Sequence, residues 1–317
     1  MSQLMNALDD FGLAVVDGLR QSPKTIAARF FYDQRGSELF EEITRLPEYY
    51  PTRTETALLR AHADDIARLT GQGGAVVEFG SGSSAKTPIL LRAIRPTAYL
   101  PIDISADFLD LSAEALAAAH PDIEVFPIAG DFTDPIRLPD DVDGPFVGFF
   151  PGSTIGNFAP QAAVDLLRSF RATLGSGATL VIGIDTRKNP RLLEAAYDDA
   201  AGVTAAFNRN LLHRMNRELD GSIDVDAFEH RVAWHDGLGR IEMHLEARED
   251  TEFRVAGQRF AMRKGETIHT ENSYKYTPEE TRLLARASGW EPLAMWTDAE
   301  AMFSLHVWHA VAAHKEP

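Results

Sequence analysis

The stretch V76-V-E-F-G-S-G-S-S-A-K-T87 decides how the rest of this sequence is interpreted. An apolar run ends at Phe79, small residues follow, and a helical pattern begins near Lys86. Glycine lets the backbone approach a ligand closely, and the first turn of a helix presents N–H groups that lack partners. The segment G80-S-G-S-S-A85 also fits the G-x-G-x-x-G/A pattern of dinucleotide-binding turns. Any tight turn from a strand into a helix gives similar letters, so this stretch alone leaves the ligand open.

Further apolar runs follow this stretch, and helical patterns lie between most of them. Strands that are apolar throughout and alternate with helices indicate a parallel sheet covered on both faces. We therefore predict an α/β fold with a doubly wound sheet. The predicted strands are 75–79, 98–102, 124–128, 146–150 and 179–184, and the predicted helices are 86–95, 105–119 and 161–174.

From about residue 190 the pattern changes. Residues 191–218 predict one long helix, and the segments after it alternate apolar and polar residues. Turn signals between these segments predict an antiparallel meander. Its predicted strands are 228–235, 240–247, 251–256 and 258–262.

A last helix is expected after Thr277, which suits an N-cap position, with Pro278 in the first turn. Two strand-like segments follow and are expected to rejoin the main sheet. We predict two domains from these changes of pattern. The first comprises residues 61–190 and 278–317, and the second is a smaller α+β domain of residues 1–60 and 191–277.

Composition excludes several classes of function. The 317 residues carry a net charge of −16, which opposes binding to nucleic acid or to anionic membranes. No stretch approaches the roughly 20 apolar residues of a membrane span, and the N-terminus lacks the basic start of a signal peptide. We therefore expect a cytoplasmic protein that binds neither nucleic acid nor a membrane. Nothing in the sequence demands a partner chain, so we expect a monomer.

Cysteine and histidine usage bears on metal binding. The chain has no cysteine, which excludes disulfides, thiolate nucleophiles and zinc–thiolate sites. Its ten histidines show no H-E-x-x-H spacing. His306 and His309 lie in an apolar, strand-like run in which neighbouring side chains alternate faces. We therefore interpret that pair as structural and expect no metal site.

Acidic and aromatic residues accompany the first three predicted strands. Glu78 directly precedes the glycines, Asp103 follows the second strand, and Asp131 and Phe132 follow the third. A carboxylate after the second strand can bind ribose hydroxyls, and an acid beside an aromatic ring can bracket an adenine. This pattern is typical of S-adenosylmethionine-dependent methyltransferases. Other interpretations stay open: Asp103 also suits the start of a helix, Phe132 suits a core, and Lys86 suits a solvated surface.

Five stretches together resemble the histidine Nα-methyltransferases of ergothioneine biosynthesis. They follow one another in order over nearly the whole chain, and the blocks L-P-E-Y-Y-P-T-R-T-E and P-G-S-T-I-G-N-F are specific to that family. The stretches are F31-Y-D-Q-R-G-S-E-L-F-E-E-I-T-R-L-P-E-Y-Y-P-T-R-T-E55, E78-F-G-S-G-S-S-A-K-T87, F150-P-G-S-T-I-G-N-F158, A196-Y-D-D-A-A-G-V-T-A-A-F-N208 and I268-H-T-E-N-S-Y-K-Y276.

The resemblance implies a class I methyltransferase sheet and S-adenosylmethionine as the cofactor. It implies that the α-amino group of L-histidine is methylated three times to give hercynine. It also implies that the cofactor is contacted by Gly80, Lys86, Asp103, Asp131 and Phe132.

The resemblance further implies which residues hold the substrate. Tyr32 and Tyr49 would lie beside the amine as the catalytic residues, and Tyr49 would also bind the substrate. Asn157 and Tyr197 would hold the amine and carboxylate end. Glu271 and Ser273 would hydrogen-bond the imidazole, with Met243 lining its pocket.

Purely structural roles, without a bound ligand, also stay open for these residues. Asn157 follows a glycine and suits a left-handed turn. Tyr49 suits a packing role, Tyr197 suits the apolar face of a helix, and the stretch from Ile268 to Tyr276 suits a polar turn.

Methyl transfer needs an aligned, neutral amine and no nucleophilic side chain of the protein. A tyrosine with an ordinary pKa near 10 is a poor base, so we expect the two tyrosines to position the amine while water removes its proton. Three other functions stay open: a relative that methylates a tryptophan-type amino acid, a dehydrogenase that uses NAD, and a module that binds S-adenosylmethionine without consuming it.

Overall fold

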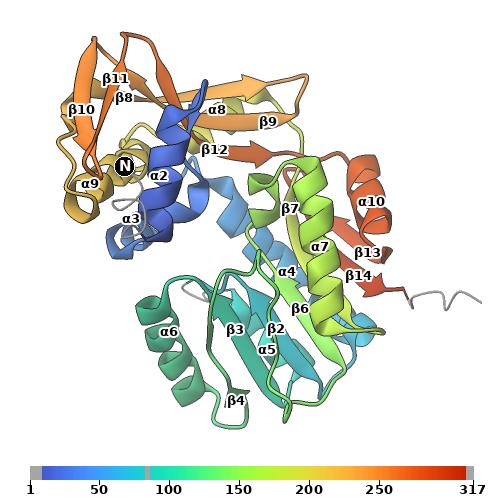
Figure 1. The fold of residues 1–317 in the computed structure, drawn as a ribbon. Helices are drawn as coiled ribbons and strands as arrows, with labels where there is room; N and C mark the ends of the chain where they lie inside the picture. Colours follow the sequence, from blue (N-terminus) through green and yellow to red (C-terminus); the bar gives the residue numbers. More distant parts are fainter. Residues whose placement is uncertain (1–8, 83–85, 312–317) are drawn as a thin grey trace, which may run out of the picture. The chain divides into compact units, whose positions relative to one another are not determined.

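The computed structural model describes residues 9–82 and 86–311 (Figure 1). These residues divide into two compact units, each built from two separate parts of the chain. Unit 1 is the described part of Met1–Tyr50 with Asn189–Ser273, and unit 2 is Pro51–Lys188 with the described part of Tyr274–Pro317. Helix α4 (Tyr50–Thr70) runs unbroken through residue 60, near which the sequence suggested a domain boundary.

A mixed, mostly parallel sheet forms the centre of unit 2. Among the described residues its strand order is β13-β14-β7-β6-β2-β3-β4, and β5 pairs with β3 beyond β4. This confirms the predicted α/β fold and the return of the last two segments to the main sheet. The strands are β2 (Ala75–Phe79), β3 (Ala98–Asp103), β4 (Glu124–Val125), β5 (Ile128–Ala129), β6 (Phe146–Phe150), β7 (Thr179–Asp185), β13 (Trp290–Thr297) and β14 (Phe303–Ala310).

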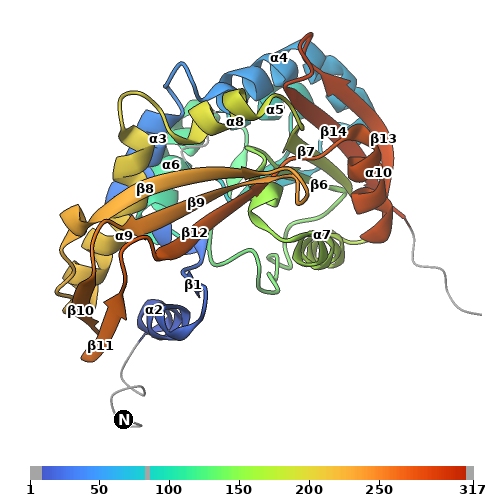
Figure 2. The ribbon, with the colours of Figure 1, turned by 90° about the horizontal axis from the view of Figure 1, so that it is seen from above.

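Helices cover both faces of this sheet, as Figure 2 shows from above. Val77 on β2 belongs to the core under α7 and α10, whereas its neighbour Val76 belongs to the core under α4 and α5. Successive apolar residues are therefore buried on opposite faces, which explains the continuous apolar runs. The covering helices besides α4 are α5 (Thr87–Ile94), α6 (Ala106–Ala119), α7 (Pro160–Leu174) and α10 (Pro278–Ala287).

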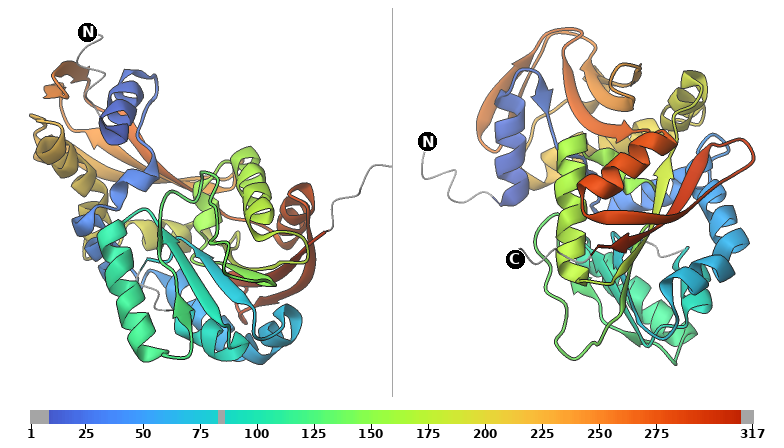
Figure 3. Two further views of the ribbon diagram at one scale, coloured as in Figure 1. Left: turned by 60° about the horizontal axis from the view of Figure 1, so that its bottom comes forward. Right: turned by 90° about the vertical axis from the view of Figure 1, so that its right-hand side faces the viewer.

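Two predictions from the sequence concern single elements of unit 2. The strand predicted over 124–128 is two short strands, because Pro127 between them has no N–H group for the ladder. The predicted start of α10 is confirmed: Thr277 Oγ1 accepts from Glu280 N at 3.3 Å, and Thr277 N donates to Glu280 at 2.8 Å. After α10, the red strands β13 and β14 form a long antiparallel pair (Figure 3, right).

Unit 1 is an α+β structure with a four-stranded sheet in the order β1-β12-β9-β8. The predicted single meander is wrong, because β10 and β11 pair only with each other among the described strands. Ser222 N donates to Arg254 O and Ala256 N donates to Leu219 O, so β10 bonds to the segment after α9 instead of to the sheet. The elements are α2 (Asp10–Arg20), β1 (Lys24–Thr25), η1 (Ala28–Phe31), α3 (Gln34–Ile43), η3 (Val225–Ala227), β8 (Phe228–His235), β9 (Arg240–Ala247), β10 (Thr251–Val255), β11 (Gln258–Met262) and β12 (Thr267–Tyr274).

The single helix predicted over 191–218 is also wrong. The chain forms α8 (Pro190–Tyr197) and α9 (Val203–Glu218), and Gly202 between them has a φ of 74°. The Asp199 carboxylate accepts from Val203 N at 3.0 Å and from Thr204 N at 2.7 Å, so it caps the start of α9. These hydrogen bonds keep the pKa of Asp199 low, although burial alone would raise it.

Among the described residues, no helix is both long and apolar enough to span a bilayer.

Glu78 is a buried acid on the central strand β2, with 1% of its surface exposed. Its Oε2 accepts from Thr87 Oγ1 at 2.7 Å and from Tyr99 OH at 2.6 Å. Burial raises the pKa of Glu78 from 4.5 to about 7, because the charged form loses its hydration. This acid therefore packs under the glycine turn and binds the start of α5.

Replacing Glu78 by Gln is expected to flatten the pH dependence of the free energy of unfolding. Glu78 stabilises fully below pH 4.5, where both states hold the proton, and this contribution is lost as the pH rises to about 7. The loss amounts to about 3 kcal/mol by pH 8. Urea unfolding of both proteins between pH 5 and 8 measures the difference.

The matched control is Glu124→Gln, which changes an exposed carboxylate on β4. It should leave the slope of the wild type intact. Equal slopes in the Glu78→Gln variant and the wild type would contradict the assignment.

Candidate functional site

The glycine turn is held by the end of the neighbouring strand β3. Gly80 N and Ser81 N both donate to Ile102 O, at 2.8 and 3.1 Å. Gly82 N donates to Asp103 Oδ2 at 2.9 Å. Gly80 and Gly82 have φ values of 75° and 48°, a region that other residues rarely adopt. Ala85, the last position of the predicted fingerprint, lies outside the described residues.

Asp103 connects three parts of this edge. Besides Gly82, its carboxylate accepts from Ser105 N at 2.9 Å, and its carbonyl accepts from Gly130 N at 2.9 Å. The N-cap of α6 is Ser105, so Asp103 is not the cap itself. Its hydrogen bonds instead fix the glycine turn, β3 and the segment after β5 against one another.

Phe132 lies directly against the glycine turn. A Cβ atom added to Gly80 would come within 3.1 Å of the Phe132 ring. The same ring packs edge-on against Phe150 and Phe170, with centroids 5.6 and 6.1 Å apart. Asp131 accepts from Thr133 N at 2.9 Å. Phe132 is therefore partly buried at the edge of the core, and its contact with a cofactor stays a prediction.

Lys86 is the N-cap residue of α5, and its ammonium forms an ion pair with Glu55. Glu55 is fully buried, and its carboxylate also accepts from Gly152 N at 2.9 Å. The Lys86 side chain retains 16% exposure, so it is not the solvated lysine that one interpretation allowed. Glu55 was not expected from the sequence, although it ends the block L-P-E-Y-Y-P-T-R-T-E.

Asn157 ends a short helix, η2 (Thr154–Asn157), that follows β6. Gly152 and Ser153 have positive φ values of 80° and 57° in this loop, whereas Asn157 does not. Ser153 Oγ accepts from Asp185 N at 2.9 Å, which attaches the loop to the end of β7. Asn157 therefore belongs to the same edge of the sheet as the glycine turn.

The remaining predicted residues lie in unit 1. Tyr32 packs edge-on against Phe40 and Phe207, with ring centroids 5.7 and 5.8 Å apart. Tyr49 also contacts Phe40, and its ring centroid lies 6.5 Å from that of Tyr197. The structure thus brings the three tyrosines into one aromatic group, in which Phe40 packs against both Tyr32 and Tyr49.

A buried polar network joins Tyr197 to β12 at two points. Tyr197 OH lies 2.7 Å from Ser273 Oγ, and the Tyr197 carbonyl accepts from His230 Nε2 at 2.8 Å. Asn208 Nδ2 donates to His230 Nδ1 at 2.9 Å, and Thr270 Oγ1 donates to Asn208 Oδ1 at 2.8 Å. Burial lowers the pKa of His230, so the ring is neutral with its proton on Nε2.

No functional role was predicted from the sequence for Asn208, His230 or Thr270. A polar residue inside a helical or strand pattern gives no periodic signal of burial. The stretch that ends at Asn208 was the nearest indication, because the resemblance already included it.

Glu271 and Ser273 lie on β12, so the polar-turn interpretation is wrong for this part of the stretch. Both side chains are buried, with 9% and 2% of their surface exposed. Met243 on β9 is buried as well, and its carbonyl accepts from Thr270 Oγ1 at 3.0 Å. Strand β12 therefore presents a carboxylate and a hydroxyl in an interior that contains Tyr197.

The histidine pair on β14 does not form a ligand set. His306 and His309 are three residues apart on a strand, so they project to opposite faces. His306 Nε2 lies 2.9 Å from Ser304 Oγ, and burial lowers the pKa of His306 to about 3.

Comparison with known proteins identifies the family. Residues 11–310 match the family described as histidine-specific, S-adenosylmethionine-dependent methyltransferases. The chain belongs to this family.

Curated relatives of known name agree with this membership. The chain is 42% identical to the histidine N-alpha-methyltransferase of Mycolicibacterium smegmatis over 91% of each protein. It is 39% identical to that of Mycobacterium tuberculosis over 92% of each. A 4-dimethylallyltryptophan N-methyltransferase of Claviceps purpurea is 26% identical over 90% of each chain.

A solved structure is similar in fold. It is an S-adenosylmethionine-dependent methyltransferase from Clostridium acetobutylicum with a TM-score of 0.52 and 10% identity. The alignment covers 87% of this chain and 99% of that one. The fold is thus that of a class I methyltransferase.

The residues at the sheet edge fit the cofactor of this family. S-adenosylmethionine supplies an electrophilic methyl group on a sulfonium, together with a ribose and an adenine. Gly80 and Gly82 leave the backbone uncovered by a Cβ, Asp103 offers a carboxylate at the end of β3, and Phe132 offers a ring face. We expect these residues, with Lys86 and Asp131, to hold the cofactor.

Replacing Gly80 by Ala is expected to weaken binding of S-adenosylhomocysteine by roughly tenfold, because the new Cβ pushes on Phe132. The positive φ adds a strain of about 1 kcal/mol. Calorimetric titration measures the affinity, and thermal unfolding measures the strain.

Gly71→Ala is the matched control, since Gly71 has a φ of 81° and no atom within 4 Å of its added Cβ. It should share the strain and keep the affinity. An unchanged affinity in Gly80→Ala would remove Phe132 and Gly80 from the cofactor site.

Proposed function

We propose that this protein transfers methyl groups from S-adenosylmethionine to the α-amino nitrogen of L-histidine, and that three transfers give hercynine for ergothioneine biosynthesis. The match of residues 11–310 to the histidine-specific family carries this proposal. A relative called ergothioneine biosynthesis protein 1, from Neurospora crassa, is 30% identical, and the chain covers 32% of its length. That name supports the place of the reaction in the pathway.

The two units would divide the work. Unit 2 would bind S-adenosylmethionine, because it holds the glycine turn, Asp103 and Phe132 at the carboxyl edge of its parallel strands. Unit 1 would bind histidine through Tyr197, Glu271 and Ser273. Asn157 carries an amide whose donor and acceptor suit an amino acid zwitterion, and its part in substrate binding stays a prediction.

Recognition of the imidazole would rest on Glu271 and Ser273. An imidazole ring offers one donor and one acceptor, and a carboxylate next to it also favours the protonated ring. An indole offers a single donor and gains less from these groups. A tryptophan-type substrate, which one relative's name suggests for that protein, would leave part of this polar site without partners.

The amine must lose its proton before each transfer. The Tyr32 ring packs against Phe40 and Phe207, and the residue is half-buried. A tyrosine with an ordinary pKa near 10 is a poor base near neutrality, so we assign Tyr32 and Tyr49 to positioning the amine. Water would accept the proton.

Two expectations remain predictions: that the protein acts in the cytoplasm and that it is a monomer. Light scattering during size-exclusion chromatography tests the second one. A dimer mass would overturn it.

The proposal is tested by incubating the protein with S-adenosylmethionine and a panel of amino acids. Mass spectrometry should find histidine carrying one, two and three methyl groups. A product only with tryptophan would overturn the substrate and keep the family, and binding without any product would overturn catalysis. Stabilisation by NAD in place of S-adenosylhomocysteine would contradict the cofactor.

Glu271→Gln should raise KM for histidine about tenfold or more, because a charge-assisted hydrogen bond is lost while the shape is kept. KM for S-adenosylmethionine should stay the same. Initial rates at varied histidine measure both constants.

The control for this change is Glu252→Gln, an exposed glutamate on β10. It should leave both constants at the wild-type values. The role of Glu271 would be refuted by an unchanged KM for histidine in a well-folded variant.

Tyr32→Phe should lower the rate less than about tenfold and leave the shape of its pH profile unchanged, since positioning through one hydroxyl is worth about 1 kcal/mol. The measurement is kcat between pH 6 and 10. If the wild-type rate rises with pH and the variant loses that rise, Tyr32 is instead the proton acceptor.

A further inference from the structure

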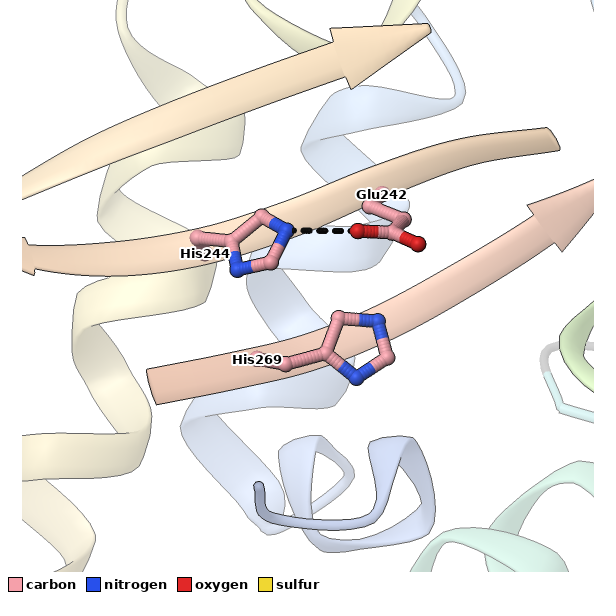
Figure 4. A group of neighbouring side chains, drawn as sticks. All are labelled: Glu242, His244 and His269. Carbon is pink, nitrogen blue, oxygen red and sulfur yellow. Dashed lines mark hydrogen bonds and ion pairs between the residues drawn. The ribbon is translucent and has the colours of Figure 1, made fainter. Parts of the chain in front are cut away.

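Three potential metal ligands meet on two neighbouring strands of unit 1. They are Glu242 and His244 on β9 and His269 on β12, and their ligand atoms all lie within 4.8 Å of one another. Figure 4 shows the three side chains turned toward one another. None of them has a role in the function proposed above.

Strand geometry explains why these side chains meet. Glu242 and His244 are two residues apart on β9, so both project to the same face, and Met243 projects to the other. Strand β12 lies next to β9 in the sheet, and it brings His269 to the same group. The cluster and the Met243 side chain therefore occupy opposite faces of β9.

The Glu242 carboxylate is bound differently at its two oxygens. Arg240 Nε donates to Oε1 at 2.8 Å. His244 Nε2 lies 2.9 Å and His235 Nε2 lies 3.1 Å from Oε2. Burial alone would raise the pKa of Glu242, but the hydrogen bonds from Arg240 and His244 lower it. A charged carboxylate oriented by a second side chain is a common feature of metal sites.

His269 adds an unsatisfied nitrogen. Its Nε2 is buried and has no hydrogen-bond partner among the described residues, and the ring also forms a hydrogen bond with the Glu271 backbone. Burial lowers the pKa of His269, so the ring is neutral and one nitrogen keeps a lone pair. A buried nitrogen without a partner is costly, and coordination of a cation would satisfy it.

We propose that Glu242, His244 and His269 bind one divalent transition-metal ion, with Zn²⁺ as the probe of choice. Two imidazoles and one carboxylate are a known zinc ligand set, and imidazole donors also suit Cu²⁺ and Ni²⁺. His235 Nε2 also contacts this carboxylate but does not belong to the group of three ligands. Hard cations such as Mg²⁺ and Ca²⁺ prefer all-oxygen ligands and are not expected here.

A bound metal ion would link β9 to β12 at His269, which lies two residues before Glu271. The site goes beyond the proposed function and does not depend on it. No metal site was expected from the sequence. His244 and His269 are 25 residues apart and lie on different strands, so histidine spacing could not reveal them as a pair of ligands.

The test uses the full chain without a histidine tag, dialysed against a chelator and then titrated with Zn²⁺ in a calorimeter. We expect saturable binding of one ion per chain and a rise in Tm of roughly 5 °C at saturating Zn²⁺. His244→Gln and His269→Gln should each weaken the affinity at least about tenfold and abolish the rise in Tm.

His213→Gln is the matched control, because His213 is an exposed histidine on α9. It should bind Zn²⁺ as the wild type does. Absence of saturable binding, or equal affinity in the His269→Gln variant, would overturn the site. If a variant unfolds, the visible spectrum of Co²⁺ bound to the wild type decides, since a spectrum of octahedral aqueous Co²⁺ would refute coordination.

Methylation by the chelator-treated protein is measured separately. Its presence or absence concerns the proposed function alone, whereas the calorimetric result concerns the metal site alone.

Discussion

The buried ion cluster of Asp185, Lys188 and Lys275 is the constraint on which the two-part construction of this chain depends. Asp185 is fully buried at the end of β7, with Lys188 Nζ 2.5 Å and Lys275 Nζ 2.7 Å from its oxygens. Burial alone would raise the pKa of Asp185, but the charges of Lys275 and Lys188 lower it. Burial lowers the pKa of Lys188 to about 8, against the opposing effect of Asp185. Removing one member of such a cluster typically costs about 3–5 kcal/mol.

The ion cluster lies where the chain leaves unit 2 and where it returns to it. Lys188 is the last residue before the chain leaves unit 2, and Lys275 comes just after its return at Tyr274. Tyr276 N donates to Asp185 O at 3.1 Å, and Arg187 N donates to Tyr276 O at 3.3 Å. One carboxylate therefore holds the departing and returning segments together, so residues 189–273 can form a separate unit without loosening the sheet of unit 2.

Much of unit 2 was predictable because its signals are local. The apolar run 146–150 predicts a strand in a sheet that helices cover on both faces. Thr277 and Glu280, three residues apart, predict the start of a helix. The predictions that were wrong concern elements whose structure depends on hydrogen-bond partners outside the local pattern. The break at Gly202 depends on the Asp199 cap, and β10 leaves the meander because it bonds to the segment after α9. Glu55 is buried where Gly183 leaves room, a fit across 128 residues that no spacing pattern records.

Substrate choice can be located more narrowly than the polar composition of β12 suggests. Asn208 uses both Nδ2 protons, on His230 Nδ1 and His244 O, and its Oδ1 accepts from Thr270. His230 is neutral and bonded at both nitrogens, and Asn208 uses both amide protons, so neither side chain has a donor left for a ligand. Their effect is to fix the register of β12 and the carbonyl of Tyr197. A slip of one residue would exchange the faces to which the strand's side chains point. These hydrogen bonds therefore help determine where Glu271 and Ser273 point, and those two are the side chains that we propose choose the amino acid.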